Sequence, residues 1–210
     1  MKLHYEILDE QRQALLPQFT GFKEEGFYLA GGTALALVLG HRDSIDFDFF
    51  NIEPFDTSAL FARLQRVFEG HTLLKTQEET DTLSVLIDDN VRVSFFSYPY
   101  PLIQPLIESE YFQLASVEDI ACMKLSAVTG RTAFKDYVDL YFILAIVSLK
   151  DILAALQKKM PQLDPLLVQK SLIYFDDLHE ESILFKTKPV SMVEIKTRLT
   201  DLVKEYPSLR

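Results

Sequence analysis

The chain has 210 residues, of which 48% are hydrophobic and 25% charged, values that suit one sizeable globular domain or two small ones and exclude long disordered stretches. The formal net charge of −10 at pH 7 argues against a protein that coats nucleic acid, because contacts to phosphate dominate that kind of binding. No run approaches the roughly 18 uncharged apolar residues of a membrane span, and the start "MKLHYEILDEQRQ" lacks the apolar core of a secretory signal, so we expect a cytoplasmic protein.

Helices and strands alternate in the first hundred residues. Apolar residues at helical spacing predict helices, and alternating or short apolar runs bounded by turn residues predict strands. The predicted elements are, in chain order, a helix over 5–24 interrupted near Pro17, a strand over 27–31, a helix over 33–39, a strand over 44–50, a helix over 57–68, and strands over 71–80, 81–87 and 91–98. Pro54 with Asp56 or Thr57 marks the start of the helix over 57–68.

The second half of the chain is predicted to be helical. The segment "YPYPLIQP", residues 98–105, contains three prolines and is interpreted as the crossing between two halves. Ser116 is a candidate N-cap with acidic residues in the following turn. A largely apolar helix over 131–149 follows, and two or three further helices are expected over 149–210. This pattern divides the chain into an α/β domain, 1–104, and a helical domain, 105–210.

Cys122 is the only cysteine in the chain, which excludes an intramolecular disulfide and a cysteine cluster for zinc or iron. Its setting, "IACMKL", contains no residue arranged to activate a thiol. We therefore expect Cys122 to be a small core residue.

The first candidate site is a pair of acids in "SIDFDFF". On a strand, Asp46 and Asp48 emerge with Ser44 on one face, whereas on a helix the two acids would point roughly 200° apart. The residues of the opposite face, expected in the core, are Ile45, Phe47 and Phe49. Paired like charges beside a core are costly unless a cation compensates them, and Mg²⁺ takes one or two carboxylates together with phosphate oxygens. The alternative is two solvent-exposed acids on an edge strand.

A glycine pair supplies the second part of this candidate site. Gly31 and Gly32 lie between a predicted strand and a predicted helix, where free backbone N–H groups at the positive helix end can bind a triphosphate. Thr33 could cap that helix or donate to a phosphate. Arg42 could clamp a phosphate or pair with Asp43 or Asp46, and both interpretations are open. His41 has no identifiable partner and is interpreted as a polar loop residue rather than a general base.

The segment "GGTALALVLGHRDSIDFDFF" resembles the signature of the AbiEii/AbiGii toxin family: a glycine pair, His-Arg-x-Ser and Asp-x-Asp. This family is a branch of the nucleotidyltransferase superfamily related to the polymerase-beta-like enzymes. A second segment, "KLSAVTGRTAFKDYVDLYFIL", is similar to another conserved part of the family, in which a lysine and an arginine precede a helix with Lys/Arg-Asp-x-x-Asp. Together the two segments cover about a fifth of the chain.

The resemblance implies an α+β fold, with a nucleotidyltransferase-like mixed sheet flanked by helices in 1–104 and a helical part in 105–210 that completes the active-site cleft. It implies transfer of a nucleoside monophosphate from a nucleoside triphosphate (NTP) with Mg²⁺ or Mn²⁺. The implied acceptor is RNA, such as transfer-RNA ends, and the implied partner is a cognate antitoxin. The implied site residues are Asp46 and Asp48 for metal and catalysis; Lys124, Asp136 and Asp139 for catalysis; and Gly31, Gly32, Thr33, Arg42, Ser44, Arg131 and Lys135 for the nucleotide.

The spacing within the second segment agrees in part with this assignment. An unbroken helix would align Lys124, Arg131, Lys135 and Asp139 along one face, although Gly130 can break it. Without the resemblance, an exposed ladder of ion pairs is the favoured interpretation of Lys135 and Asp139. An Asp in the apolar stretch "DYVDLYFILAIV" nevertheless calls for a reason.

One departure from the superfamily pattern concerns the third metal carboxylate. The strand predicted to carry it, "VRVSFFSY", has Ser94 at the expected place. A third acid would then have to come from elsewhere, such as Asp136 or Asp139. The leading hypothesis is an AbiEii-like toxin that transfers nucleotides to RNA. The alternatives are a catalytically degenerate nucleotide-binding or regulatory protein of the same fold, and a nucleotidyltransferase with a small-molecule acceptor, which the acidic balance favours mildly.

Overall fold

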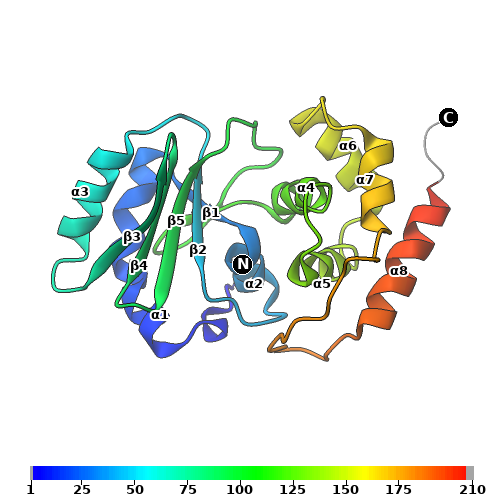
Figure 1. Ribbon diagram of the computed structural model, residues 1–210, viewed down its shortest axis with the longest axis horizontal. Helices are drawn as coiled ribbons and strands as arrows, with labels where there is room; N and C mark the ends of the chain where they lie inside the picture. Colours follow the sequence, from blue (N-terminus) through cyan, green and yellow to red (C-terminus); the bar gives the residue numbers. More distant parts are fainter. Residues whose placement is uncertain (1, 207–210) are drawn as a thin grey trace.

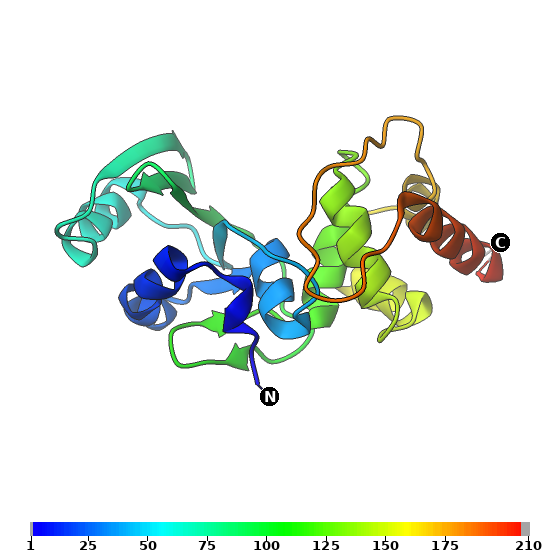
Figure 2. The same ribbon diagram turned by 90° about the horizontal axis from the view of Figure 1, so that it is seen from below.

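A computed structural model describes residues 2–206 of the protein. A sheet with its covering helices forms one part of the molecule, the helices α4 to α8 gather in the other, and α2 lies between them (Figures 1 and 2). No helix in the described range is long and apolar enough to cross a membrane. The α-helices are α1 Glu10–Leu15, α2 Gly31–Leu39, α3 Thr57–Val67, α4 Val117–Ala127, α5 Phe134–Ile143, α6 Leu149–Lys159, α7 Pro165–Leu172 and α8 Met192–Glu205.

The sheet has seven strands in the order β3-β4-β5-β2-β1-β7-β6. Its strands are β1 Tyr28–Ala30, β2 Phe47–Asn51, β3 Leu73–Glu79, β4 Thr82–Ile87, β5 Val91–Ser97, β6 Ile107–Glu108 and β7 Gln113–Leu114. The pairs β2–β5 and β1–β7 are parallel, and the other pairs are antiparallel. The sheet is therefore mixed, and the α+β class predicted from the sequence is confirmed.

The sheet extends beyond the proline-rich segment. Strands β6 and β7 follow residue 104, and β7 pairs with β1. The segment 98–105 thus leads into these two short strands before the chain enters the helical part. The predicted domain boundary at 104/105 therefore falls between strands of one sheet. The sequence did not predict β6 and β7, because strands of two residues are too short to show a periodic pattern.

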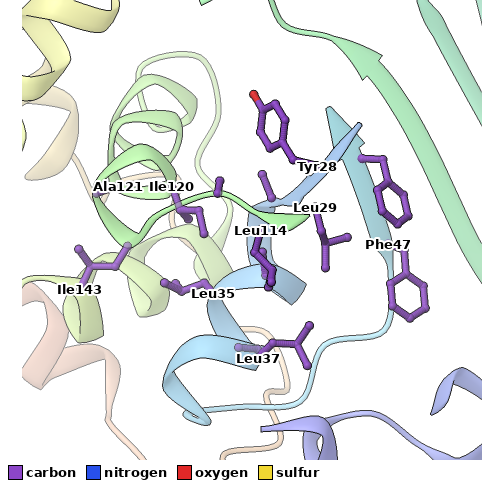
Figure 3. Close-up of a cluster of buried hydrophobic side chains, with 14 of the residues drawn as sticks. Tyr28, Leu29, Leu35, Leu37, Phe47, Leu114, Ile120, Ala121 and Ile143 are labelled. Atoms are coloured by element: carbon purple, nitrogen blue, oxygen red, sulfur yellow. The ribbon is translucent and has the colours of Figure 1, made fainter. Parts of the chain in front are cut away.

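Two apolar layers hold the sheet. On one face, aromatic rings from β2 and β5 meet those of the 3₁₀ helix Leu16–Glu25, with ring centroids 4.9 Å apart for Phe19–Phe47 and 5.3 Å for Phe22–Phe95. On the other side, α2 packs between the sheet and the helices α4 and α5, and Figure 3 shows Leu35 of α2 close to Ile143 of α5. The core is consequently continuous from the sheet into the helical part.

The helical part begins as predicted and then departs from the prediction. Ser116 caps α4 by accepting a hydrogen bond from the Asp119 amide. The helix expected over 131–149 is shorter. Turns over 128–130 and an irregular stretch over 131–133 precede α5, which begins at Phe134 and ends at Ile143. Three helices, α6 to α8, follow within the described residues.

Cys122 lies fully buried in α4, and burial raises the pKa of its thiol to about 12. A thiol with so high a pKa carries little thiolate at neutral pH and is a poor nucleophile. This agrees with its predicted place in the core.

Candidate active site

A cleft of about 730 Å³ lies between the sheet and the helices α4 and α5. Asp46 and Asp48 both line it. Strand β2 begins only at Phe47, so Asp46 lies in the irregular segment before the strand, and the predicted strand start at Ser44 is wrong. Ile45, expected in the core, is 53% exposed. The predicted alternation holds from Phe47 onward, where Phe47 and Phe49 are fully buried.

The glycine pair forms the first turn of α2 rather than a turn that precedes it. Gly31 has a φ of +67°, a conformation that favours glycine, and a Cβ placed there would lie 3.2 Å from Oδ2 of Asp48. A Cβ on Gly32 would lie 2.6 Å from Nη2 of Arg42 and 3.5 Å from Oγ of Ser44. The absence of side chains at these positions lets the helix start approach the acids and the guanidinium directly.

Thr33 is buried, and its hydroxyl is used within the protein. It donates to the backbone carbonyl of Asp46 and lies 2.7 Å from Oγ of Ser44. These bonds tie α2 to the segment before β2, which explains why that segment leaves the strand. Both Thr33 and Ser44 line the cleft, but the Thr33 hydroxyl does not cap α2.

Arg42 is paired with Asp139, a partner that neither predicted interpretation included. Its Nε and Nη2 lie 2.7 and 2.8 Å from the two Asp139 carboxylate oxygens, and Nη1 donates to the Asp43 carbonyl. His41 lies in the loop between α2 and β2, as predicted, but it is buried and has a partner: its Nε2 lies 2.9 Å from the same carboxylate. Burial alone would raise the pKa of Asp139, but Lys124, His41 and Arg42 together hold it well below its usual range.

Two helices of the other part bring a second charged group to the cleft. Nζ of Lys124 in α4 lies 2.7 Å from a carboxylate oxygen of Asp136 and 2.7 Å from one of Asp139, both in α5. Arg131, between the helices, binds Asp136 through Nε at 2.9 Å. Lys124, Arg131, Lys135 and Asp136 line the cleft. They meet because the chain turns between α4 and α5, not because they share one helix face.

Asp139 does not reach the cleft. It is fully buried and is not among the residues that line the cleft, but it binds Lys124 and Arg42, which are. The interpretation as an exposed ion-pair ladder is wrong for Asp139, since a buried carboxylate must be paired to be tolerated. The apolar stretch around it reflects this burial.

Asp48 carries an unbalanced negative charge. Burial, followed by the charge of Asp46, raises its pKa to about 6, while Lys124, Arg131 and Arg92 offset this only in part. A cation between the two carboxylates would relieve the repulsion. Two carboxylates suffice for Mg²⁺, which fills its remaining positions with water and phosphate oxygens. The donor set therefore fits a magnesium ion bound together with a phosphate ligand.

In the part of the chain that the structure describes, no third carboxylate joins these two. Ser94 is the direct neighbour of Asp48 across β2 and β5, and its Oγ lies 3.0 Å from that of Ser84. Asp136 is engaged by Lys124 and Arg131. Within residues 2–206, no group of three or more His, Cys, Asp or Glu side chains is placed to hold a metal ion.

The cleft also contains aromatic residues that sequence reasoning missed. Phe50, Phe96 and Tyr98 line the same cavity, together with the apolar Met123. The sequence held a signal for Phe50, which lies two residues after Asp48 and so points to the same face of the strand. Phe96 and Tyr98 could be placed only once the pairing of β2 with β5 was known.

Comparison with known proteins places the chain in a family. The profile described as "Nucleotidyl transferase AbiEii toxin, Type IV TA system" matches residues 15–208. The chain belongs to this family. The predicted membership and the prediction of a nucleotidyltransferase are thereby confirmed. The protein aq_aa25 of Aquifex aeolicus (strain VF5), described as uncharacterized, is 35% identical over 203 residues, which cover 94% of this chain and 96% of that protein.

Solved structures share the fold of this AbiEii family member at low sequence identity. MenT4, a nucleotidyltransferase toxin from Mycobacterium tuberculosis H37Rv, has a TM-score of 0.63 at 14% identity and covers 94% of this chain and 83% of its own. JHP933 from Helicobacter pylori has a TM-score of 0.57 at 17% identity, with 94% of both chains covered. These similarities support the fold assignment.

Proposed function

We propose that this AbiEii family member transfers a nucleoside monophosphate from an NTP to an RNA acceptor, such as a transfer-RNA end, as the toxin of a toxin–antitoxin system. The observation that carries the proposal is the cleft, which is lined by Asp46, Asp48 and the glycine start of α2 together with Lys124, Arg131 and Lys135. A triphosphate and a divalent cation are the ligands that this combination of N–H groups, acids and cations suits.

Each side chain has a distinct role in the proposed site. Gly31 and Gly32 present backbone N–H groups to the phosphates, and Arg131 and Lys135 add positive charge. Asp46 and Asp48 hold Mg²⁺, or Mn²⁺ in its place, which when bound neutralises phosphate charge and favours ionisation of the acceptor hydroxyl. Asp139 acts as a positioning residue, since it holds both Arg42 and Lys124.

The proposed step is an in-line displacement at the α-phosphorus. The acceptor hydroxyl oxygen forms a bond to that phosphorus while the bond to the oxygen bridging the α- and β-phosphates breaks. Pyrophosphate leaves, and the hydroxyl proton passes to solvent. Arg131, Lys135 and Lys124 stabilise the negative charge that the phosphate oxygens carry during the displacement.

The test uses NTPs labelled at the α-phosphate, total RNA and Mg²⁺. The wild type is expected to label RNA, and the double variant Asp46→Ala/Asp48→Ala to lose at least about 100-fold in rate, since it removes the proposed metal ligands. Glu180→Ala/Glu181→Ala is the matched control, because it removes two exposed acids outside the cleft. Equal labelling by wild type and the Asp46/Asp48 variant would refute the assigned roles.

The position of Ser94 beside Asp48 favours a second candidate, a protein that binds NTP without transferring it. Calorimetry separates the two functions. Binding of NTP that is independent of Mg²⁺, without any labelled product on RNA, would support the binding protein and refute the transferase.

A further inference from the structure

One end of the cleft carries aromatic side chains that phosphate chemistry does not require. Phe50 of β2, Phe96 of β5 and Tyr98 just after β5 all line the cavity. We infer that these three rings, which we call the aromatic shelf, bind the base of the NTP by stacking. The inference rests on the proposed function, since it identifies how the same cleft recognises a further part of the nucleotide.

The register of the sheet fixes the place of the aromatic shelf. Asp48 pairs with Ser94 and, two residues further along, Phe50 pairs with Phe96. Side chains two residues apart on a strand point to the same face and lie about 7 Å apart along it. The Asp48 carboxylate and the Phe50 ring are therefore separated along the cleft by a distance comparable to that between phosphate and base in a nucleotide.

The rings support one another and leave surface free. The centroids of Phe50 and Phe96 lie 5.2 Å apart with planes inclined by 32°, and Tyr98 meets Phe50 edge-on at 5.7 Å. Phe50, Phe96 and Tyr98 are each partly exposed, whereas Phe49 and Phe95 on the opposite face of the sheet are fully buried. The shelf is thus a firm apolar surface that opens into the cleft rather than part of the core.

The opposite end of the cleft suits the phosphates. Beyond Asp48, away from the shelf, lie Gly32, Arg42 and Ser44, which approach one another closely. A triphosphate laid on the shelf would lose its hydration without gaining donors, whereas a base there gains stacking contacts. The order of groups along the cleft therefore orients the nucleotide with its phosphates at the glycine pair and its base on the shelf.

This mode of recognition determines how well the site distinguishes the bases. Stacking uses the ring face, which all four bases present. The shelf itself carries one polar side-chain group that lines the cleft, the hydroxyl of Tyr98. We expect the affinities of the four NTPs to lie within about tenfold of one another, since stacking itself is tolerant of sequence.

The experiment compares ligands with and without a base. ATP, CTP, GTP, UTP and inorganic tripolyphosphate are titrated by calorimetry, with Mg²⁺ and without RNA, into wild type, Phe96→Ala, Phe96→Leu and Phe96→Tyr. Phe96→Ala and Phe96→Leu are expected to weaken NTP binding by about fivefold or more and to leave tripolyphosphate binding unchanged. Phe96→Tyr, which keeps the ring, is expected to bind as wild type.

Phe61→Ala is the matched control, because Phe61 is a partly buried ring on α3 outside the cleft. Phe96→Leu keeps apolar volume and tests stacking if Phe96→Ala does not fold. Unchanged NTP affinity in both variants, with tripolyphosphate still bound, would overturn the inference and leave the proposed function standing. Wild type that binds neither NTP nor tripolyphosphate would refute the proposed function itself.

Discussion

A single buried carboxylate organises the charges around the cleft. Asp139 contacts His41, Arg42 and Lys124, each at 2.7–2.9 Å. Although burial opposes it, the charges of Asp139 and Asp136 raise the pKa of Lys124, so this lysine stays protonated. Since Asp139 does not line the cleft, its influence on a ligand passes through Arg42 and Lys124.

Asp48 is expected to destabilise the metal-free protein. Its pKa is raised from 3.8 to about 6, so folding favours the protonated carboxyl. The contribution of the protonated Asp48 to the free energy of unfolding is therefore full below pH 4 and is lost as the pH rises through 6 and the group ionises. Asp48→Asn removes this charge, and in EDTA at pH 8 it is expected to raise the free energy of unfolding by about 1–3 kcal/mol. Thermal denaturation at pH 8 and pH 4 measures the effect, which disappears at pH 4.

Asp176→Asn, which changes an exposed acid, is the control for this pH dependence and is expected to alter the Tm little at either pH. A lower Tm for Asp48→Asn than for wild type at pH 8 would contradict the account, because it would mean that the ionised Asp48 stabilises the empty cleft.

At the scale of elements, the start of α2 depends on the glycine at position 31. Gly31→Ala is expected to lower the free energy of unfolding by about 1–2 kcal/mol, because the φ of +67° is strained for alanine and the new Cβ would crowd Asp48. Urea denaturation measures the loss. Gly130→Ala is the matched control, since a Cβ there would meet only the Ala127 carbonyl, at 3.9 Å. Equal stabilities for the two variants would refute the role of the backbone at Gly31.

Elements with strong local signals were predictable from the sequence. The helix over 57–67 has apolar residues at helical spacing after the Asp56 cap, and the strands β4 and β5 have clear apolar alternation. The segment Ser44–Asp46 was misassigned because its conformation depends on hydrogen bonds from Thr33, 13 residues from Asp46. Strands β6 and β7, of two residues each, exist only through pairing with each other and with β1.

The residues of the candidate site were predictable, whereas their partners were not. Asp46, Asp48, Gly31 and Lys124 all line the cleft, as their motifs led us to expect. The bond between His41 and Asp139 joins residues 98 positions apart. Nothing local in either segment indicates such a pairing, because it arises only when α5 packs beside α2.

At the scale of the whole molecule, several interactions join 1–104 to 105–210. Strand β7 pairs with β1, and Arg42 binds Asp139. Nζ of the buried Lys159 lies 2.7 Å from both the Asp119 carboxylate and the Pro101 carbonyl. The two proposed domains therefore share an interface that contains buried charges, and Arg42 would lose its carboxylate partner if the parts separated.

This interface leads us to expect one cooperative unfolding transition rather than two. Urea denaturation followed by far-UV circular dichroism, which reports helix and sheet, should coincide with near-UV circular dichroism, which reports the packing of the 9 tyrosines. A fragment of residues 1–104 should remain unfolded by both probes, since it lacks β7 and leaves β1 and α2 without the helices that cover them. Two separate transitions, or a folded 1–104 fragment, would show that the sheet part is stable alone. The cleft would then be a surface between independent domains, whereas a single transition ties the positions of Asp48 and Lys124 to the folding of the whole chain.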